Sequence, residues 1–368
     1  MVTKERELHA HDISSRYVPR ISPDKNDAMI EIEGLPLQDI ITIHSNAEYA
    51  LDCGMFTGIN KETLSAGEER AVRFKDSIEN VKKIIIEQLK NRELWTITDK
   101  ITNAPFIDDY NKVWVYTDKI YADECVDYYM QQYRTTFTVT NISKEDALKF
   151  FGRTAYMKGA KSFRIDMGAY AQIDICSEEI VSPPDFSNVP PINRPVMNPD
   201  FFRAVAKLQE ERWYRATYEG KKEKLREFED DMIKAFHDAK FLVPVKGMEA
   251  LKNNTESTGD KGEGVLKKGT TISIPTLTKG EGDAMLKATP AFTDWDEFNK
   301  IYSQEEWGGW IWRSEDLLGA PDDIICLNAG SVGFEMSKKM IRQMLDIYDK
   351  EFADPKSDGA ADVAHKEE

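Results

Sequence analysis

Histidine, cysteine and long apolar runs are scarce in this chain of 368 residues, and each scarcity excludes a class of protein. The chain has five histidines and contains no HExxH, GxSxG or EF-hand pattern. The sequence therefore offers no recognisable catalytic centre, and we expect no metal and no cofactor. The apolar runs are as short as residues 84–86, far below the roughly 18 residues that a membrane span needs.

The four cysteines indicate a reducing compartment. Cys53, Cys125, Cys176 and Cys326 lie far apart in the sequence, and no two of them form a CxxC pair. We interpret them as small buried apolar residues rather than as disulfide or metal-binding partners. The first seven residues are too highly charged for a secretion signal. Together these features predict a cytoplasmic protein.

Positive charge is also in short supply. The chain has 49 Lys and Arg residues against 65 Asp and Glu, which gives a net charge of −16. An acidic surface repels phosphate groups, so neither nucleic acid nor an anionic membrane is an expected partner. A partner protein, or a second copy of this chain, is the interaction that the composition leaves open.

Proline marks one strong boundary. Residues 182–195 hold five of the fifteen prolines, and proline removes a backbone donor and restricts the residue before it. This stretch therefore predicts an extended linker rather than a helix or a central strand. The predicted organisation is a region without assigned fold (1–72), a first repeat (73–182), the linker (183–199), a second repeat (200–352) and a disordered acidic tail (353–368).

The segments on the two sides of the linker resemble each other in the same order, which indicates a duplication. A helical pattern runs into an apolar strand in both halves, and a strand ending in Thr-Asp follows. Next come a helical run and two strands separated by a glycine turn. The matching segments are 94–98 and 241–245, 113–118 and 290–294, 163–168 and 325–330, and 173–175 and 334–336.

Short strands mixed with amphipathic helices predict the α+β class, with a small mixed sheet in each repeat and helices packed on it. A helical region is expected over 199–239, with a break near Gly220. Residues 253–269 are polar and rich in Gly, Lys and Glu, and they predict a mobile loop. In the amino-terminal region, residues 29–32 and 40–43 are strand-like.

The second repeat resembles the amino-terminal domain of the SseB family, which is named for enhanced serine sensitivity in bacteria. The similarity lies in residues 241–245 (FLVPV), 272–275 (ISIP), 291–294 (AFTD) and 324–331 (IICLNAGS). Asp294 stands where the family usually has serine, and Ala329 where it usually has proline. The first repeat shows only degenerate versions of these motifs. The resemblance implies a bacterial cytoplasmic protein and no established reaction.

Four polar residues fall near predicted strand ends, and two interpretations of them stay open. Thr293 and Asp294 precede a helix, where their side chains would accept hydrogen bonds from free backbone amides. Thr117 and Asp118 repeat this arrangement in the first half, as a duplicated cap would. Alternatively, a shared polar pocket would be lined by Thr293, Asp294, Asn328 and Ser331.

Three of the seven tryptophans lie within six residues, at Trp307, Trp310 and Trp312. In a strand, Trp310 and Trp312 would lie on one face and Ile311 on the other. Tryptophans with an exposed face are natural anchors for a protein partner. Our leading hypothesis is therefore a non-enzymatic interaction or regulatory protein, with these tryptophans as the protein-binding residues. The rival hypothesis is a small-ligand sensor or an enzyme with the polar pocket near Thr293 and Asn328.

Overall fold

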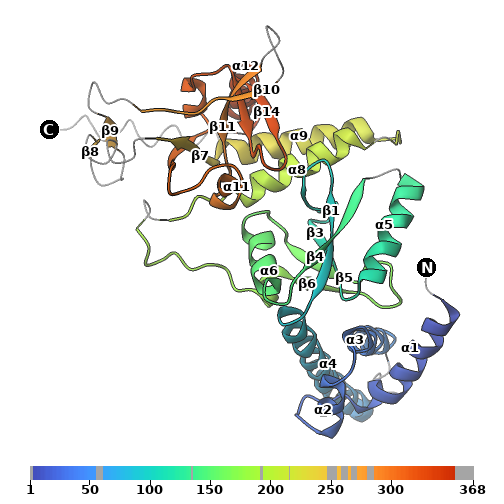
Figure 1. Ribbon diagram of the computed structural model, residues 1–368. Helices are drawn as coiled ribbons and strands as arrows, with labels where there is room; N and C mark the ends of the chain where they lie inside the picture. Colours follow the sequence, from blue (N-terminus) through green and yellow to red (C-terminus); the bar gives the residue numbers. More distant parts are fainter. Residues whose placement is uncertain are drawn as a thin grey trace. The chain divides into compact units, whose positions relative to one another are not determined.

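The computed structural model describes residues 3–54, 61–133, 136–190, 194–214, 216–246, 255–257, 264–266, 272–279 and 286–352. The chain divides into two compact units (Figure 1). Unit 1 consists of residues 1–184 and 214–216, and unit 2 of residues 185–213 and 217–368. Each unit contains a mixed sheet with helices, so the protein belongs to the α+β class, as predicted.

Unit 1 begins with helices, and the strands predicted in this region are wrong. Residues 29–32 lie in a helix that Asn26 caps, and 40–43 lie in a second helix that follows Pro36. A short apolar run fits either structure, and the wider helical spacing of buried residues 37, 40, 41, 44 and 47 decides between them. The helices are α1 (Lys4–Tyr17), η1 (Val18–Arg20), α2 (Asp27–Glu33), α3 (Leu37–Asp52) and α4 (Lys61–Lys90).

The sheet of unit 1 follows α4. Its main strands lie in the order β4-β1-β3-β5-β6, and the short β2 pairs with the far end of β1. Strands β3 and β5 are parallel, and the other neighbours are antiparallel. The strands are β1 (Leu94–Asp99), β2 (Ala104–Pro105), β3 (Lys112–Tyr116), β4 (Phe137–Ile142), β5 (Ser162–Ile165) and β6 (Ile173–Cys176); the helices are α5 (Lys119–Tyr133), α6 (Ala147–Tyr156) and α7 (Ser177–Ile180).

Unit 2 begins with two helices that pack against each other, α8 (Pro199–Trp213) and α9 (Lys221–His237). The predicted break is confirmed, because Gly220 takes a left-handed conformation with φ of 85° just before α9. The elements that follow are β7 (Lys240–Val245), β10 (Leu277–Lys279), β11 (Leu286–Ala291), α11 (Trp295–Asn299), β12 (Gly308–Arg313), η4 (Asp316–Gly319), β13 (Ile324–Leu327), β14 (Phe334–Ser337) and α12 (Lys338–Glu351).

The strands of unit 2 have the same order as those of unit 1. Strand β12 pairs antiparallel with β7, and β7 meets β11 through two backbone hydrogen bonds of 2.9 Å between Leu242 and Phe292. Strand β11 runs parallel to β13, and β13 pairs antiparallel with β14. The order β12-β7-β11-β13-β14 therefore corresponds, strand by strand and direction by direction, to β4-β1-β3-β5-β6.

The structure tests the predicted glycine turn and the predicted burial of the cysteines. The two half-buried strands with a glycine turn are confirmed as β5 and β6, with Gly168 at φ of 82° between them. All four cysteines are free, but only Cys125 is buried. The burial predicted for Cys53 and Cys176 is wrong: Cys53 follows the end of α3, and Cys176 lies on the outer face of an edge strand.

Two predicted mobile segments fall largely beyond what the structure describes. The polar insertion at 253–269 lies outside the described residues except for two short paired strands, β8 (Thr255–Ser257) and β9 (Gly264–Leu266). The predicted acidic tail, 353–368, lies outside them entirely.

Candidate functional site

Thr293 and Asn328 meet where the parallel strands β11 and β13 end, because parallel strands bring their carboxyl ends to the same edge of a sheet. The Oδ1 atom of Asn328 accepts a hydrogen bond from the Thr293 backbone amide at 3.0 Å, and its Nδ2 donates to the Thr293 hydroxyl at 3.0 Å. Asn328 has a left-handed backbone with φ of 49°, which asparagine tolerates better than most residues.

Asp294 caps helix α11, as one of the two interpretations predicted. Its Oδ1 accepts a hydrogen bond from the Glu297 backbone amide at 2.9 Å, and its Oδ2 accepts one from the Thr293 hydroxyl at 2.9 Å. The hydroxyl of Ser331 donates to Glu297 Oε2 at 2.5 Å, and Lys300 Nζ donates to Glu297 Oε1 at 3.0 Å. The structure thus joins the four predicted polar residues into one network through Glu297.

The part of this polar network around Thr293 is closed to solvent, whereas Ser331 at its edge is half-buried. Thr293, Asp294 and Asn328 expose 1%, 0% and 1% of their surface, and Glu297 exposes 0%. Their hydrogen bonds run to one another and to the backbone of α11, which satisfies the polar groups that burial would otherwise penalise. A substrate would have to displace these contacts to reach the Thr293 hydroxyl. The network therefore has a structural role: it joins the ends of β11 and β13 to the start of α11.

Unit 1 builds the same junction with a carboxylate. The Oδ1 of Asp166 accepts a hydrogen bond from the Thr117 backbone amide at 2.7 Å, and its Oδ2 accepts one from the Thr117 hydroxyl at 2.7 Å. Asp166 also has a left-handed backbone, with φ of 58°. Burial raises the pKa of Asp166 to about 7, although the hydrogen bonds from Thr117 and the charge of Arg92 oppose that rise.

The tryptophans of β12 lie as the alternation predicts. Trp310 and Trp312 share one face of the strand, with ring centroids 5.5 Å apart, and both pack on the core of unit 2. Ile311 points the other way and is 42% exposed. Trp312 is buried, whereas Trp310 is half-buried. Packing on the core therefore holds the Trp310 and Trp312 rings in place, and part of Trp310 stays exposed to solvent.

Trp307 lies before β12 and lines a pocket of about 330 Å³. Its ring packs on Tyr302 with centroids 5.1 Å apart, and Trp295 packs on Phe298 at 4.9 Å. The ammonium group of Lys246 lies 4.6 Å from the centre of the Trp307 ring. Two indoles, two glycines and three polar side chains line the pocket: Trp295, Gln304, Glu305, Glu306, Trp307, Gly308 and Gly309.

Sequence reasoning missed most of this pocket. Trp307 was predicted to bind, but Trp295 was assigned only to the start of a helix. Glu305 and Glu306 lay in a loop for which nothing was predicted. One signal was available: Gly308 and Gly309 at the start of a strand are typical of a close approach by another group. A Cβ atom on Gly309 would lie 2.6 Å from Trp295 Cη2, so the glycine makes room for that indole.

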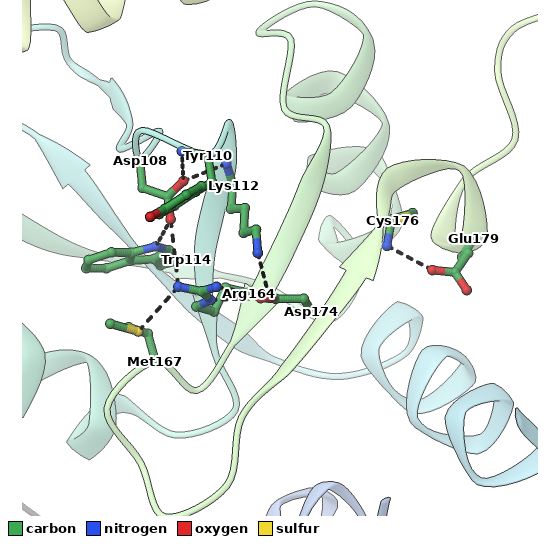
Figure 2. Close-up of polar contacts among 9 residues, drawn as sticks. All are labelled: Asp108, Tyr110, Lys112, Trp114, Arg164, Met167, Asp174, Cys176 and Glu179. Atoms are coloured by element: carbon green, nitrogen blue, oxygen red, sulfur yellow. Dashed lines mark hydrogen bonds and ion pairs between the residues drawn. The ribbon is translucent and has the colours of Figure 1, made fainter. Parts of the chain in front are cut away.

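Unit 1 carries a row of charged side chains across one face of its sheet (Figure 2). Arg164 on β5 holds Asp174 on β6 through two hydrogen bonds of 2.7 and 2.9 Å, and Lys112 on β3 donates to the same carboxylate at 2.5 Å. Burial alone would raise the pKa of the Asp174 carboxyl, but the hydrogen bonds from Arg164 and Lys112 outweigh it and lower the pKa. Beside them, the Trp114 indole N–H donates to Asp108 at 3.0 Å. The charges of the row neutralise one another, which favours a structural role.

Metal-binding clusters and membrane-spanning helices are absent from the residues that the structure describes. Within them, no group of three or more His, Cys, Asp or Glu side chains is placed to hold a metal ion. No described helix has the length and apolar character to span a bilayer.

A known protein family matches part of this chain. No curated protein and no solved structure matches the chain. The family model of the SseB protein N-terminal domain matches residues 219–343, which run from the start of α9 into α12. This match covers the strands β7, β11, β12, β13 and β14, the closed polar network and the tryptophan pocket. Over these residues of unit 2, the chain is therefore similar to the SseB protein N-terminal domain, as the sequence motifs predicted.

Proposed function

We propose that this chain is a non-enzymatic protein-interaction or regulatory protein of the SseB-like type, and that unit 2 carries its binding surface. The observation behind this proposal is the open pocket beside Trp307, formed by half-buried indoles on the segment that matches the SseB protein N-terminal domain. Partly exposed tryptophans on a rigid base are typical anchors of protein interfaces. Trp307 would make the contact, whereas Trp310 and Trp312 lie on the opposite face of β12 and would support it from the core of unit 2.

The rival hypothesis of a ligand pocket or enzyme at Thr293 and Asn328 gains less support. Those residues are buried and engaged with one another, and neither they nor Asp294 or Ser331 line the pocket beside Trp307. A catalytic or ligand-sensing role needs polar groups that a small molecule can reach. The closed network satisfies a structural need instead.

The proposal includes a duplicated origin for the two units. The support is the common strand order and the repeated junction, in which Thr117 with Asp166 occupies the place of Thr293 with Asn328. Unit 1 would then be a diverged copy of unit 2, preceded by additional helices. Four free cysteines are compatible with the bacterial cytoplasm as the compartment.

The test is native mass spectrometry of the full chain after gentle purification from a lysate of its native host. We compare the wild type with Trp307→Ala and with the control Trp213→Ala, whose tryptophan is 62% exposed on α8. The proposal expects a stoichiometric partner protein, or a dimer, that persists in the control and is lost in Trp307→Ala. Circular dichroism checks that both variants fold. Association that survives Trp307→Ala, or no association in the wild type, would overturn the proposal.

A further inference from the structure

We infer that the pocket between Trp295 and Trp307 receives a cationic side chain, the guanidinium of an arginine or the ammonium of a lysine, from the partner protein. This inference rests on the proposed function and names the chemistry that the surface recognises. The pocket, of about 330 Å³, lies at the small end of ligand pockets, so it suits one side chain rather than a nucleotide.

The aromatic part of the pocket is suited to a cation. Indole rings attract cations over their faces more strongly than other aromatic side chains. Trp307 already does so within this molecule, because the Lys246 ammonium lies 4.6 Å from its ring centre. Both indoles also rest on a fixed base, in which Phe298 supports Trp295 and Tyr302 supports Trp307. A cation entering the pocket would therefore meet rings whose positions are already set.

The charged part of the pocket has the complementary sign. Glu305 and Glu306 are exposed at the pocket, and among the described residues neither carboxylate has a hydrogen-bond or ion-pair partner. Their loop is ordered, since the amides of Glu306 and Trp307 donate to the Ser303 carbonyl at 3.2 and 2.9 Å. Two carboxylates beside two indoles attract a cation and repel an acidic group, and they outnumber the single ammonium of Lys246, which lies at the Trp307 ring and opposes a second cation. The net charge of −16 adds long-range attraction for a basic partner.

Gly309 makes this geometry possible. Its missing side chain lets the Trp295 ring lie against the start of β12, where a Cβ would come within 2.6 Å of Cη2. Gly309 is not among the residues with a positive backbone φ, so alanine fits the strand. Its Cβ would displace the Trp295 indole and press on Leu242 Cδ2, which lies 3.0 Å away. Gly309→Ala therefore changes the pocket without removing any of the groups proposed to bind.

The experiment is a titration of the full chain, followed by the indole N–H signals of Trp295 and Trp307 in nuclear magnetic resonance. The probe is Nα-acetyl-arginine methylamide, and the neutral comparison is Nα-acetyl-norleucine methylamide. We expect saturable shifts of both indoles with the arginine probe at concentrations on the order of millimolar, as for a single cation–π and charge contact. The norleucine probe should produce little change.

Three variants sharpen the result. Glu305→Gln with Glu306→Gln should weaken binding of the arginine probe about threefold or more, and Gly309→Ala by a similar factor. The control, Glu219→Gln with Glu223→Gln, changes the net charge equally at exposed positions on or before α9 and should leave binding unchanged. Equal shifts with norleucine, or equal weakening in the control, would overturn the inference.

The two proposals fail in different ways. If partner association depends on Trp307 but the arginine probe does not bind, the cationic inference is wrong and the interaction function stands. If the probe binds but association ignores Trp307, the pocket accepts cations and the proposed function is wrong. A lysine probe, Nα-acetyl-lysine methylamide, then tells whether the planar guanidinium is preferred, as stacking on indole predicts.

Discussion

At the end of its parallel strand pair, unit 1 places Asp166 against a threonine, and unit 2 places Asn328 against the equivalent threonine. Both residues have a left-handed backbone, and both accept a hydrogen bond from the threonine amide. A protonated Asp166 offers one carbonyl oxygen and one hydroxyl, which are the same acceptor and donor that the Asn328 amide offers. A negative charge at this position is costly because the site is buried, although both Asp166 oxygens accept hydrogen bonds from Thr117.

The largest effect is expected when unit 2 is given the carboxylate of unit 1. Asn328→Asp buries a new charge at a site with 1% exposure, close to the existing carboxylate of Asp294. We expect unit 2 to lose about 3 kcal/mol of stability at about pH 8. The loss should shrink at about pH 5, where the new carboxyl group takes up a proton.

Hydrogen exchange of peptides from β11 and β13 measures this loss within unit 2 itself. Asn188→Asp, at an exposed position of the same unit, adds an equal charge and serves as the control. If Asn328→Asp destabilises unit 2 no more than this control does, the junction tolerates a negative charge. The difference between Asp166 and Asn328 would then have no effect on stability.

The reverse exchange, Asp166→Asn, should stabilise unit 1. The folded pKa of Asp166 is about 7 and its ordinary value is 3.8, so the folded state holds the proton more tightly. Stability in the wild type therefore falls as the pH rises from about 4 to 7, and the full penalty remains above pH 7. At about pH 8 we expect Asp166→Asn to gain on the order of a few kcal/mol, and near pH 4 to gain nothing.

Thermal unfolding across this pH range, with hydrogen exchange in β3 and β5, measures the gain from Asp166→Asn. Asp127→Asn is the matched control, since Asp127 is exposed on α5 and is not one of the charges that shift the pKa of Asp166. A gain that is the same at all pH values would mean that Asp166 is not the titrating group.

The α+β class was accessible to sequence reasoning, but the contrast at the junction was only partly so. The glycine turn between β5 and β6 and the alternation of Trp310, Ile311 and Trp312 are local patterns, and they predicted local structure correctly. The amino-terminal helices were missed because four-residue apolar runs do not separate a strand from a buried helix.

The candidate site depended on contacts that local patterns do not reveal. Only one of the two open interpretations, the shared polar pocket, placed Thr293 near Asn328. That they are buried depends on Glu297 and Ser331 closing the edge, which is tertiary packing. The pocket was missed for the same reason: Trp295 and Gly309 are distant in sequence, and only the fold brings them together.

The helix caps of the two units offer a smaller contrast. Asp294 is fully buried and caps α11, whereas Asp118 is exposed and accepts a hydrogen bond from the Ile120 amide at 2.9 Å. Asp294→Ala should cost unit 2 about 1–2 kcal/mol, because it leaves buried donors unsatisfied, and Asp118→Ala should cost unit 1 about 0.5 kcal/mol. Urea unfolding of both variants measures the difference, and equal costs would contradict the importance of burial.

The smallest effect is expected at the outer face of the sheets. In unit 1, Arg164 pairs with Asp174 across β5 and β6, and the equivalent register in unit 2 pairs Cys326 with Glu335. Half-exposed ion pairs contribute little, so Asp174→Asn should cost unit 1 about 0.5 kcal/mol at low salt. The cost should fall towards zero in about 0.5 M salt, which screens such charges. A cost that salt does not reduce would show that the Arg164 hydrogen bonds, rather than its charge, tie β5 to β6, and that unit 1 depends on a cross-strand link at a place where unit 2 has a cysteine.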